Sequence, residues 1–429
     1  MWHLAGMWTR LVAAVALAAS LLVSCSGSGD DSSSATTAAA VSTEAELEAP
    51  TSATTSLAAS TTAASSTNPA EAYAEKGPFP VGVVELLGAP EPITVFYPGL
   101  EGDEEGKARA SYDLRAWLPP GEAAKLTDAQ TFAIDAFADL APADPDGGPY
   151  PLVVFSHGLA GYRMQSTFLT THLASWGFVV ATVEHPYRDL TAVFGDLGPL
   201  VGGLGSPESP DVQQLIHAID LVQAAADADA GPLAGLDVET TRVGAVGHSA
   251  GGFAVYGAAA ADPRIVTYVA LASPVGGSFV ASTPTTAPAV PPPDKPSLLI
   301  AGSADAIAPL ARIQAAYDAL PSPKAFAVID GVTHLGFMDI CVLTAPGEPN
   351  VLQVAKDAGV AIPDLILRLF ADGCDSKYVA ADTAWPAINS LTTAELRGEL
   401  GLDDPPVLPT QDDLDAAFPD LDISISASP

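Results

Sequence analysis

The segment Gly247-His248-Ser249-Ala250-Gly251 constrains this chain more than any other feature, because of what flanks it. A β-branched run, Val243 to Val246, precedes it and an alanine-rich stretch begins near Phe253, a pattern that predicts a strand turning sharply into a helix. Such a turn is strained and brings backbone atoms close together, so it requires small residues. The segment therefore predicts a nucleophile elbow, with Gly247, His248 and Gly251 around an exposed Ser249 hydroxyl. A serine that only caps the helix is the alternative.

A serine nucleophile requires a base and an orienting carboxylate, which follow it in the order acid and then histidine when the serine stands on such an elbow. Asp305 follows the apolar run Ser297 to Ala301, and His334 follows the next run, Ala325 to Ile329. His334 alone among the histidines comes after the acid. We therefore predict Ser249, Asp305 and His334 as the triad, with Asp330 as a competing acid.

A second signal lies upstream, where Leu152 to Phe155 forms an apolar run that leads into Ser156-His157-Gly158-Leu159. In hydrolases with this order, a His-Gly loop after the third strand supplies one backbone N–H to the oxyanion hole, and the residue after the nucleophile supplies the other. We therefore predict Leu159 and Ala250 as the oxyanion donors.

Five blocks of this sequence resemble the bacterial cutinase and polyester-hydrolase branch of the α/β-hydrolases, whose relatives include platelet-activating-factor acetylhydrolases and dienelactone hydrolases. The resemblance spans roughly residues 78 to 340, and its blocks are residues 156–159, 173–180, 247–252, 305–309 and 330–334. It implies the same fold and triad. Two departures limit it: Leu159 and the segment Ala272-Ser273-Pro274 stand where polyester hydrolases carry an aromatic clamp. The acetylhydrolase relatives often carry the acid after the sixth strand, but no carboxylate lies between Ile265 and Ser278, which favours Asp305.

The order of elements predicts an α/β fold with a mostly parallel, doubly wound sheet of eight strands and helices on both faces. The predicted strands are residues 81–87, 93–97, 152–155, 178–184, 243–246, 265–272, 297–301 and 325–329, and the predicted helices are residues 163–175, 212–225, 252–261 and 310–320. Three insertions interrupt this order, at residues 99–148, 190–210 and 335–370, and the first contains a predicted helix over 129–140. We expect the last two either to form a lid or acyl pocket or only to cover sheet edges.

The first 70 residues differ in composition from the rest of the chain. Leu11 to Val23 is an apolar run preceded by Arg10 and followed by Ser24 and Cys25, which resembles a bacterial lipobox. It predicts a signal peptide over residues 1–24, lipidation of Cys25 as a membrane anchor, and a protein held on the outer face of the cell membrane; plain secretion is the alternative.

Residues 25–70 are rich in Ser, Thr and Ala and predict a disordered tether. We expect a catalytic domain over 71–400 and an acidic tail over 401–429.

The remaining cysteines, Cys341 and Cys374, form an even pair, for which a disulfide is expected in an exported protein and two free thiols are the alternative. No cysteine stands near metal-ligand spacing with histidines, so we expect no metal, and the predicted chemistry requires no cofactor. The net charge of −34 repels polyanions, so nucleic acid is not an expected partner.

Together these features predict a serine esterase, lipase-like or cutinase-like, that acts through an acyl-enzyme on uncharged short to medium acyl esters, lipids and polyesters included. The apolar residues Leu159, Leu335, Phe337 and Met338 suggest the uncharged acyl group. The alternatives are a peptidase or perhydrolase on the same triad, and a lipid-anchored surface-binding protein without activity.

Overall fold

The computed structural model describes residues 68–429, except 87–90, 128–129, 196–203, 278–289 and 344–349. The predicted signal peptide, Cys25 and nearly all of the predicted tether lie outside the described residues. The described part of the chain falls within one compact unit. Among these residues, no helix is long and apolar enough to cross a membrane.

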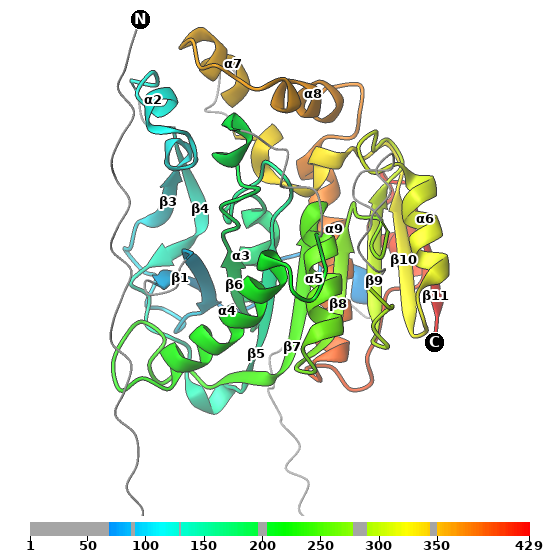
Figure 1. Cartoon of the computed structure of the whole chain (residues 1–429). Coiled ribbons are helices and arrows are strands. Elements are labelled where there is room, and N and C mark those ends of the chain that lie inside the picture. Colours follow the sequence, from blue (N-terminus) through cyan, green and yellow to red (C-terminus); the bar gives the residue numbers. More distant parts are fainter. Residues whose placement is uncertain (1–67, 87–90, 128–129, 196–203, 278–289, 344–349) are drawn as a thin grey trace, which may run out of the picture. The chain divides into compact units, whose positions relative to one another are not determined.

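An eleven-stranded mixed sheet forms the centre of the described domain, with helices on both faces (Figure 1). The strands, in their order across the sheet, are β11 (Ile423–Ser428), β10 (Lys324–Ile329), β9 (Ser297–Gly302), β8 (Ile265–Leu271), β7 (Val238–His248), β5 (Tyr150–Ser156), β6 (Val179–Val183), β2 (Ile93–Pro98), β1 (Val81–Leu86), β4 (Thr131–Ala138) and β3 (Arg109–Asp113). The six from β10 to β6 are parallel. The predicted α/β class is therefore confirmed.

The two faces of the sheet carry separate apolar clusters, because side chains alternate along each strand. In β9, Leu298 and Ile300 belong to one cluster, whereas Leu299 and Ala301 belong to the other. Since both faces are covered, the central residues of the parallel strands are mostly buried and form apolar runs in the sequence. This is why all eight predicted strands are present.

Ten α-helices are found in the described residues: α1 (Pro69–Ala72), α2 (Pro120–Ala123), α3 (Thr167–Ser175), α4 (Pro210–Ala226), α5 (Ala250–Ala261), α6 (Leu310–Ala319), α7 (Val351–Asp357), α8 (Asp364–Gly373), α9 (Ala381–Glu399) and α10 (Gln411–Ala417). Helices α3 and α9 pack on one face of the sheet, and α4, α5 and α6 pack on the other. The four helices predicted from the sequence correspond to α3, α4, α5 and α6. Helix α1 buries Ala70 completely, so the folded domain begins slightly before the predicted boundary at residue 71.

The helix predicted over residues 129–140 is wrong, since this segment forms strand β4. Its side chains alternate, with Ile134 and Ala136 buried and Asp135 turned outward. The three alanines of β4 favour a helix, whereas its Thr, Ile and Phe residues favour a strand, and pairing with β1 and β3 determined the outcome.

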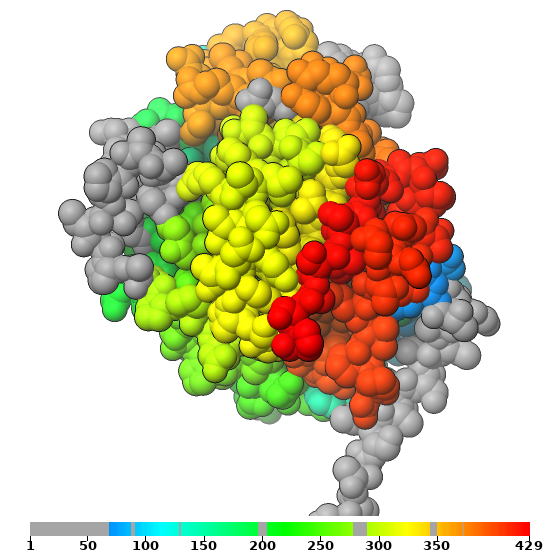
Figure 2. Space-filling view, turned by 90° about the vertical axis from the view of Figure 1, so that its right-hand side faces the viewer, coloured from blue at the N-terminus to red at the C-terminus, as the bar shows by residue number. Residues whose placement is uncertain are grey.

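The C-terminal segment predicted as an acidic tail is folded and contains β11, which together with β3 and β4 makes three strands beyond the predicted eight. Thr410 and Asp413 form a capping box that begins α10, and Leu414 is buried in the main core. Strand β11 then pairs antiparallel with β10 along its whole length. Figure 2 shows this red segment lying against the yellow one. Residues 411–428 therefore belong to the domain.

Candidate active site

The elbow around Ser249 is the most constrained backbone segment at the carboxyl edge of the sheet. Strand β7 ends at His248 and α5 begins at Ala250, which leaves Ser249 between them with φ 54° and ψ −116°. A positive φ is unfavourable for a residue with a side chain and persists only where the surroundings enforce it. A Cβ atom at Gly247 would lie 2.2 Å from the Gly251 carbonyl oxygen, and one at Gly251 would lie 2.0 Å from the Ser156 carbonyl oxygen. Both glycines are therefore required by close backbone contact.

Three side chains predicted from distant parts of the sequence form one hydrogen-bonded relay. His334 Nε2 lies 2.9 Å from Ser249 Oγ, and His334 Nδ1 lies 2.8 Å from Asp305 Oδ2. All three are buried, with at most 6% of each residue exposed. With the proton on Nδ1, the imidazole donates to the carboxylate and Nε2 is free to accept the serine proton. This is the geometry of an activated serine.

The structure distinguishes between the two candidate acids. Asp305 Oδ1 accepts the backbone N–H groups of Ile307 and Ala308, at 2.8 and 2.7 Å, which fixes the carboxylate and leaves Oδ2 for His334. Asp330 instead accepts a hydrogen bond from Ser303 Oγ at 2.5 Å. Asp305 is therefore the carboxylate that orients the histidine, and Asp330 shapes the neighbouring loop.

The predicted oxyanion donors lie on the two segments that meet at Ser249. Ala250 is the first residue of α5, and Leu159 follows β5 in the loop that contacts the elbow. A Cβ atom at Gly158 would lie 3.3 Å from Ser249 Cβ. The N–H groups on either side of Leu159 are engaged: Gly158 N donates to Gln165 Oε1 at 3.1 Å, and Ala160 N donates to the Arg188 carbonyl oxygen at 2.8 Å. The backbone on both sides of Leu159 is thus held in place.

His248 contributes a contact that the sequence did not predict. Its Nε2 lies 3.1 Å from the His334 carbonyl oxygen, so this nitrogen carries the proton and donates it to that carbonyl. Its Nδ1 accepts from Gln165 Nε2 at 3.1 Å. Burial lowers the pKa of His248 well below its usual range, so the ring is neutral and positions the backbone of His334.

A cavity of ≈ 220 Å³ opens beside Ser249, and its walls are almost entirely apolar. The 3-10 turn Leu114–Trp117 and the loop after it supply one side, Leu190 and Phe194 supply another, and α7 and α8 form the roof. Figure 1 shows α7 and α8 beside each other at the top of the view. Residues of all three insertions therefore line the cavity, so the insertions do more than cover the edges of the sheet. Two parts of these insertions, residues 196–203 and 344–349, lie outside the described residues. Leu159, Leu335 and Met338 line it as expected, whereas Phe337 is fully buried beneath it.

A disulfide joins Cys341 to Cys374 and so connects the roof to the histidine segment. Cys374 directly follows α8, and Cys341 ends the 3-10 turn Asp339–Cys341. Thr333 Oγ1 also donates to the Gly373 carbonyl oxygen at 2.8 Å. The end of α8 is therefore fixed against the residues that precede His334.

No cluster of three or more His, Cys, Asp or Glu side chains that can hold a metal ion occurs in the described part of the chain. The hydrogen-bonded relay of Ser249, His334 and Asp305 lies beside an apolar cavity. This arrangement matches acyl transfer.

Residues 130–196 match the family model of platelet-activating factor acetylhydrolase, isoform II. This segment runs from β4 through the Leu159 loop, α3 and β6, so it contains one predicted oxyanion donor but not the triad.

Similar curated proteins include the platelet-activating factor acetylhydrolases of Cavia porcellus, 44% identical over 48 residues, and of Bos taurus, 51% identical over 39 residues. A putative phospholipase A2 of Schizosaccharomyces pombe is 34% identical over 89 residues. These matches cover 11%, 9% and 21% of this chain and 11%, 9% and 19% of the relatives. The chain thus aligns with a tenth to a fifth of the length of these relatives. Over these short segments the chain is similar to platelet-activating factor acetylhydrolases and a putative phospholipase A2, and the similarity agrees with the α/β fold described above.

Asp339 leads to a prediction about pH, because it lies between Met338 and Ile340, two residues of the cavity wall. Its carboxylate accepts from Thr167 N at 2.7 Å and Thr167 Oγ1 at 2.6 Å, at the start of α3. Burial raises the pKa of Asp339 to about 7. When the pH exceeds the ordinary pKa of an aspartate, Asp339 loses its proton in the unfolded chain but keeps it in the folded chain. The free energy of unfolding therefore falls as the pH rises from about 4 to 7.

Asp339→Asn removes this titration and retains an acceptor oxygen. We expect the wild type to lose up to about 1.4 kcal/mol of unfolding free energy per pH unit relative to the variant across this window. Denaturant unfolding at pH 5, 6, 7 and 8 measures it, with the exposed Asp420→Asn as the control. A difference between wild type and Asp339→Asn that stays constant with pH contradicts the assignment.

Proposed function

We propose that this protein is a serine carboxylic-ester hydrolase that forms an acyl-enzyme on Ser249. The observation that supports it most is the relay from Asp305 through His334 to Ser249 at the base of an apolar cavity. The similarity to acetylhydrolases over residues 130–196 supports the same reaction class.

In the proposed mechanism, His334 Nε2 takes the proton of Ser249 as the hydroxyl oxygen bonds to the ester carbonyl carbon. Asp305 holds the imidazole in the required tautomer and stabilises the imidazolium. The Leu159 and Ala250 N–H groups bind the oxyanion, at about 3 to 4 kcal/mol for each donor. The tetrahedral intermediate collapses, the C–O bond to the alcohol breaks, and His334 protonates the leaving oxygen. A water molecule, activated by His334, then releases the acid.

The proposed substrate is an uncharged ester of a lipid. The cavity walls are apolar, so they favour an aliphatic chain and disfavour a charged group. The names of two relatives support an ester-type substrate and a lipid, since they are a platelet-activating factor acetylhydrolase and a putative phospholipase A2. Because the aromatic clamp positions hold Leu159 and Ala272, the cutinase-like extension of this proposal is limited to aliphatic polyesters.

Ser249→Ala is expected to abolish hydrolysis of p-nitrophenyl butyrate, and Asp305→Asn is expected to lower kcat on the order of 10⁴-fold because the histidine tautomer is no longer held. Asp330→Asn is the matched control, since it alters a carboxylate of the adjacent loop that does not contact His334. Steady-state kinetics at pH 8 measure all three. A loss below tenfold in Asp305→Asn, or an equal loss in Asp330→Asn, refutes the proposed acid.

Leu369→Trp tests where the acyl chain binds. Leu369 lines the cavity from α8, so the larger ring is expected to shift the preferred p-nitrophenyl ester to a chain at least two carbons shorter. Leu367 belongs to the same helix but not to the cavity wall, so Leu367→Trp is the control. A chain-length series from acetate to palmitate gives the optimum of each variant. An unchanged optimum in Leu369→Trp shows that the chain lies elsewhere.

We further propose that the protein is exported and held at the outer face of the membrane by lipidation of Cys25. Two or three acyl chains give stable anchoring where a single chain does not. The Cys341–Cys374 disulfide is compatible with an oxidising compartment. In a bacterial host, the wild type is expected in the membrane fraction and Cys25→Ser in the soluble fraction. Equal distribution of both contradicts the anchor.

A further inference from the structure

The most deeply buried cation in the described chain is the side chain of Arg188, which has no exposed surface. Arg188 lies in the loop that follows β6, where its nearest carboxylate oxygen is Asp211 Oδ2, 3.8 Å from Nε. At this distance Arg188 and Asp211 form an ion pair but no hydrogen bond. Burial lowers the pKa of Arg188, with Asp211 acting in the opposite direction. A buried arginine is costly unless its donors are well used.

The donors of Arg188 are directed at two consecutive residues of the segment 156–161, which contains the predicted donor Leu159 and is called the oxyanion segment below. Nη1 donates to the His157 carbonyl oxygen, and Nη2 donates to Ser156 Oγ at 2.8 Å. The fork of the guanidinium thus holds the end of β5 and the first residue after it. A lysine cannot reproduce two such contacts, because its donors radiate from a single atom.

The backbone of the same loop holds the other end of the oxyanion segment. The Arg188 carbonyl oxygen accepts the N–H of Ala160 at 2.8 Å, and Leu190 N donates to the Gly161 carbonyl oxygen at 2.8 Å. Ala160 has φ 61°, an unfavourable conformation for alanine. The contact with Arg188 helps to maintain this conformation immediately after Leu159.

Neighbouring polar groups fix the orientation of Ser156 as well. Because Ser156 Oγ accepts from Arg188, its own proton is directed to His185 Nε2, 2.9 Å away. His185 Nδ1 then donates to Gln214 Oε1 at 2.6 Å. Burial, together with the positive charge of Arg188, lowers the pKa of His185 well below its usual range, which agrees with a neutral ring. The chain of hydrogen bonds is therefore consistent from Arg188 to Gln214.

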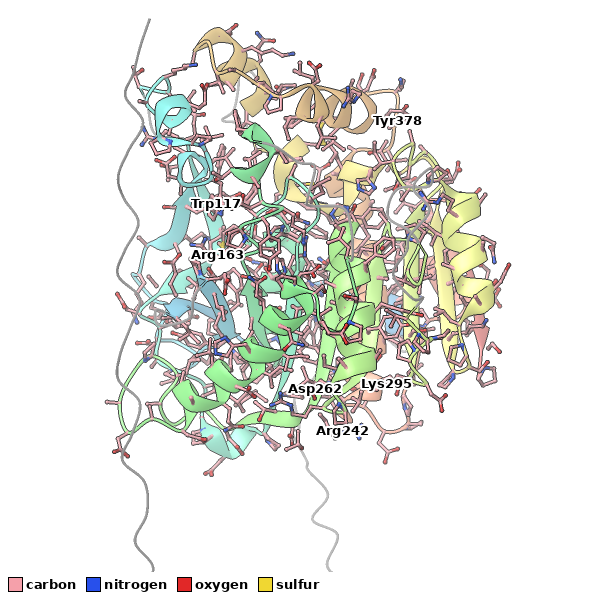
Figure 3. The ribbon with its side chains drawn as sticks, in the orientation of Figure 1. Trp117, Arg163, Arg242, Asp262, Lys295 and Tyr378 are labelled. Atoms are coloured by element: carbon pink, nitrogen blue, oxygen red, sulfur yellow. A yellow bond between two sulfur atoms is a disulfide. The ribbon has the colours of Figure 1, made fainter. Side chains whose placement is uncertain are left out.

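The other nearby carboxylate, Glu184, is held by different partners. Its Oε2 accepts from Trp117 Nε1 at 2.6 Å and from Arg163 Nη1 at 3.0 Å. Arg163 also stacks over the Trp117 ring, and Figure 3 shows the two side chains close to each other. Glu184 is thus engaged with Arg163, and the guanidinium of Arg188 remains directed at the oxyanion segment.

We propose that Arg188 is a positioning residue that holds the Leu159 N–H in place for the oxyanion, by clamping His157 and Ser156 with its side chain and Ala160 with its backbone. This inference rests on the proposed hydrolase function. Leu159 itself lies between the clamped residues, so a shift of the clamp moves its N–H away from the position that the oxyanion occupies. Loss of one oxyanion donor costs about 10²- to 10³-fold in kcat, and a displaced donor loses part of that.

Arg188→Lys is expected to lower kcat by about 10- to 100-fold while KM changes less than threefold, because the oxyanion forms only after binding. The affinity for a trifluoromethyl ketone, whose adduct carries an oxyanion, is expected to fall by a similar factor. Arg397→Lys is the matched control: Arg397 is also largely buried, and it contacts Asp403 and the Trp176 carbonyl oxygen rather than the oxyanion segment. Thermal unfolding is measured for each variant.

A lower melting temperature in Arg188→Lys with unchanged kcat and ketone affinity overturns the inference. Should Arg188→Lys fail to fold, Ser156→Ala removes one contact of the clamp and keeps the buried charge. It is expected to lower kcat several-fold, and unchanged kcat again overturns the inference.

The test separates this inference from the proposed function. Loss of activity in Ser249→Ala together with wild-type kcat in Arg188→Lys leaves the hydrolase standing and refutes the role of Arg188. A folded wild-type protein that neither hydrolyses esters nor reacts with a fluorophosphonate refutes both.

Discussion

The site depends on one close contact, in which the elbow backbone packs directly on the end of β5. Gly251 can approach the Ser156 carbonyl oxygen only because it lacks a side chain, and Gly247 approaches Gly251 in the same way. This packing maintains the unfavourable backbone of Ser249 and at the same time sets the distance between the nucleophile and the Leu159 loop. This packing therefore places the nucleophile directly against the end of β5, from which the Leu159 loop continues.

The parallel sheet explains why residues far apart in sequence meet at this contact. The carboxyl ends of parallel strands lie at one edge, so the segments after β5, β7, β9 and β10 converge there. Asp305 and His334 reach Ser249 from two of these segments. The roof is then attached to the histidine segment by the Cys341–Cys374 disulfide, so the cavity and the relay share one framework.

The sequence predicted those parts of the molecule that depend on local pattern or on strand order. Apolar runs predicted the eight central strands, and the order of Ser249, Asp305 and His334 follows from parallel strands. Strand β4 was missed because its three alanines favour a helix while its Thr, Ile and Phe residues favour a strand, and only the pairing with β1 and β3 decides between the two. The contacts of Arg188 and Gln165 were not predicted, because they join residues of different segments, for which single-sequence patterns contain no signal.

The most direct test of this account is to identify the residue that an activated organophosphonate modifies in the folded protein. Peptide mass spectrometry after reaction with a p-nitrophenyl phosphonate locates the adduct. The account predicts one adduct per chain, on the peptide that contains Ser249. It predicts no adduct when the protein is unfolded before the reagent is added. An adduct on another serine, or none on a folded protein, contradicts the assignment of Ser249 as the nucleophile.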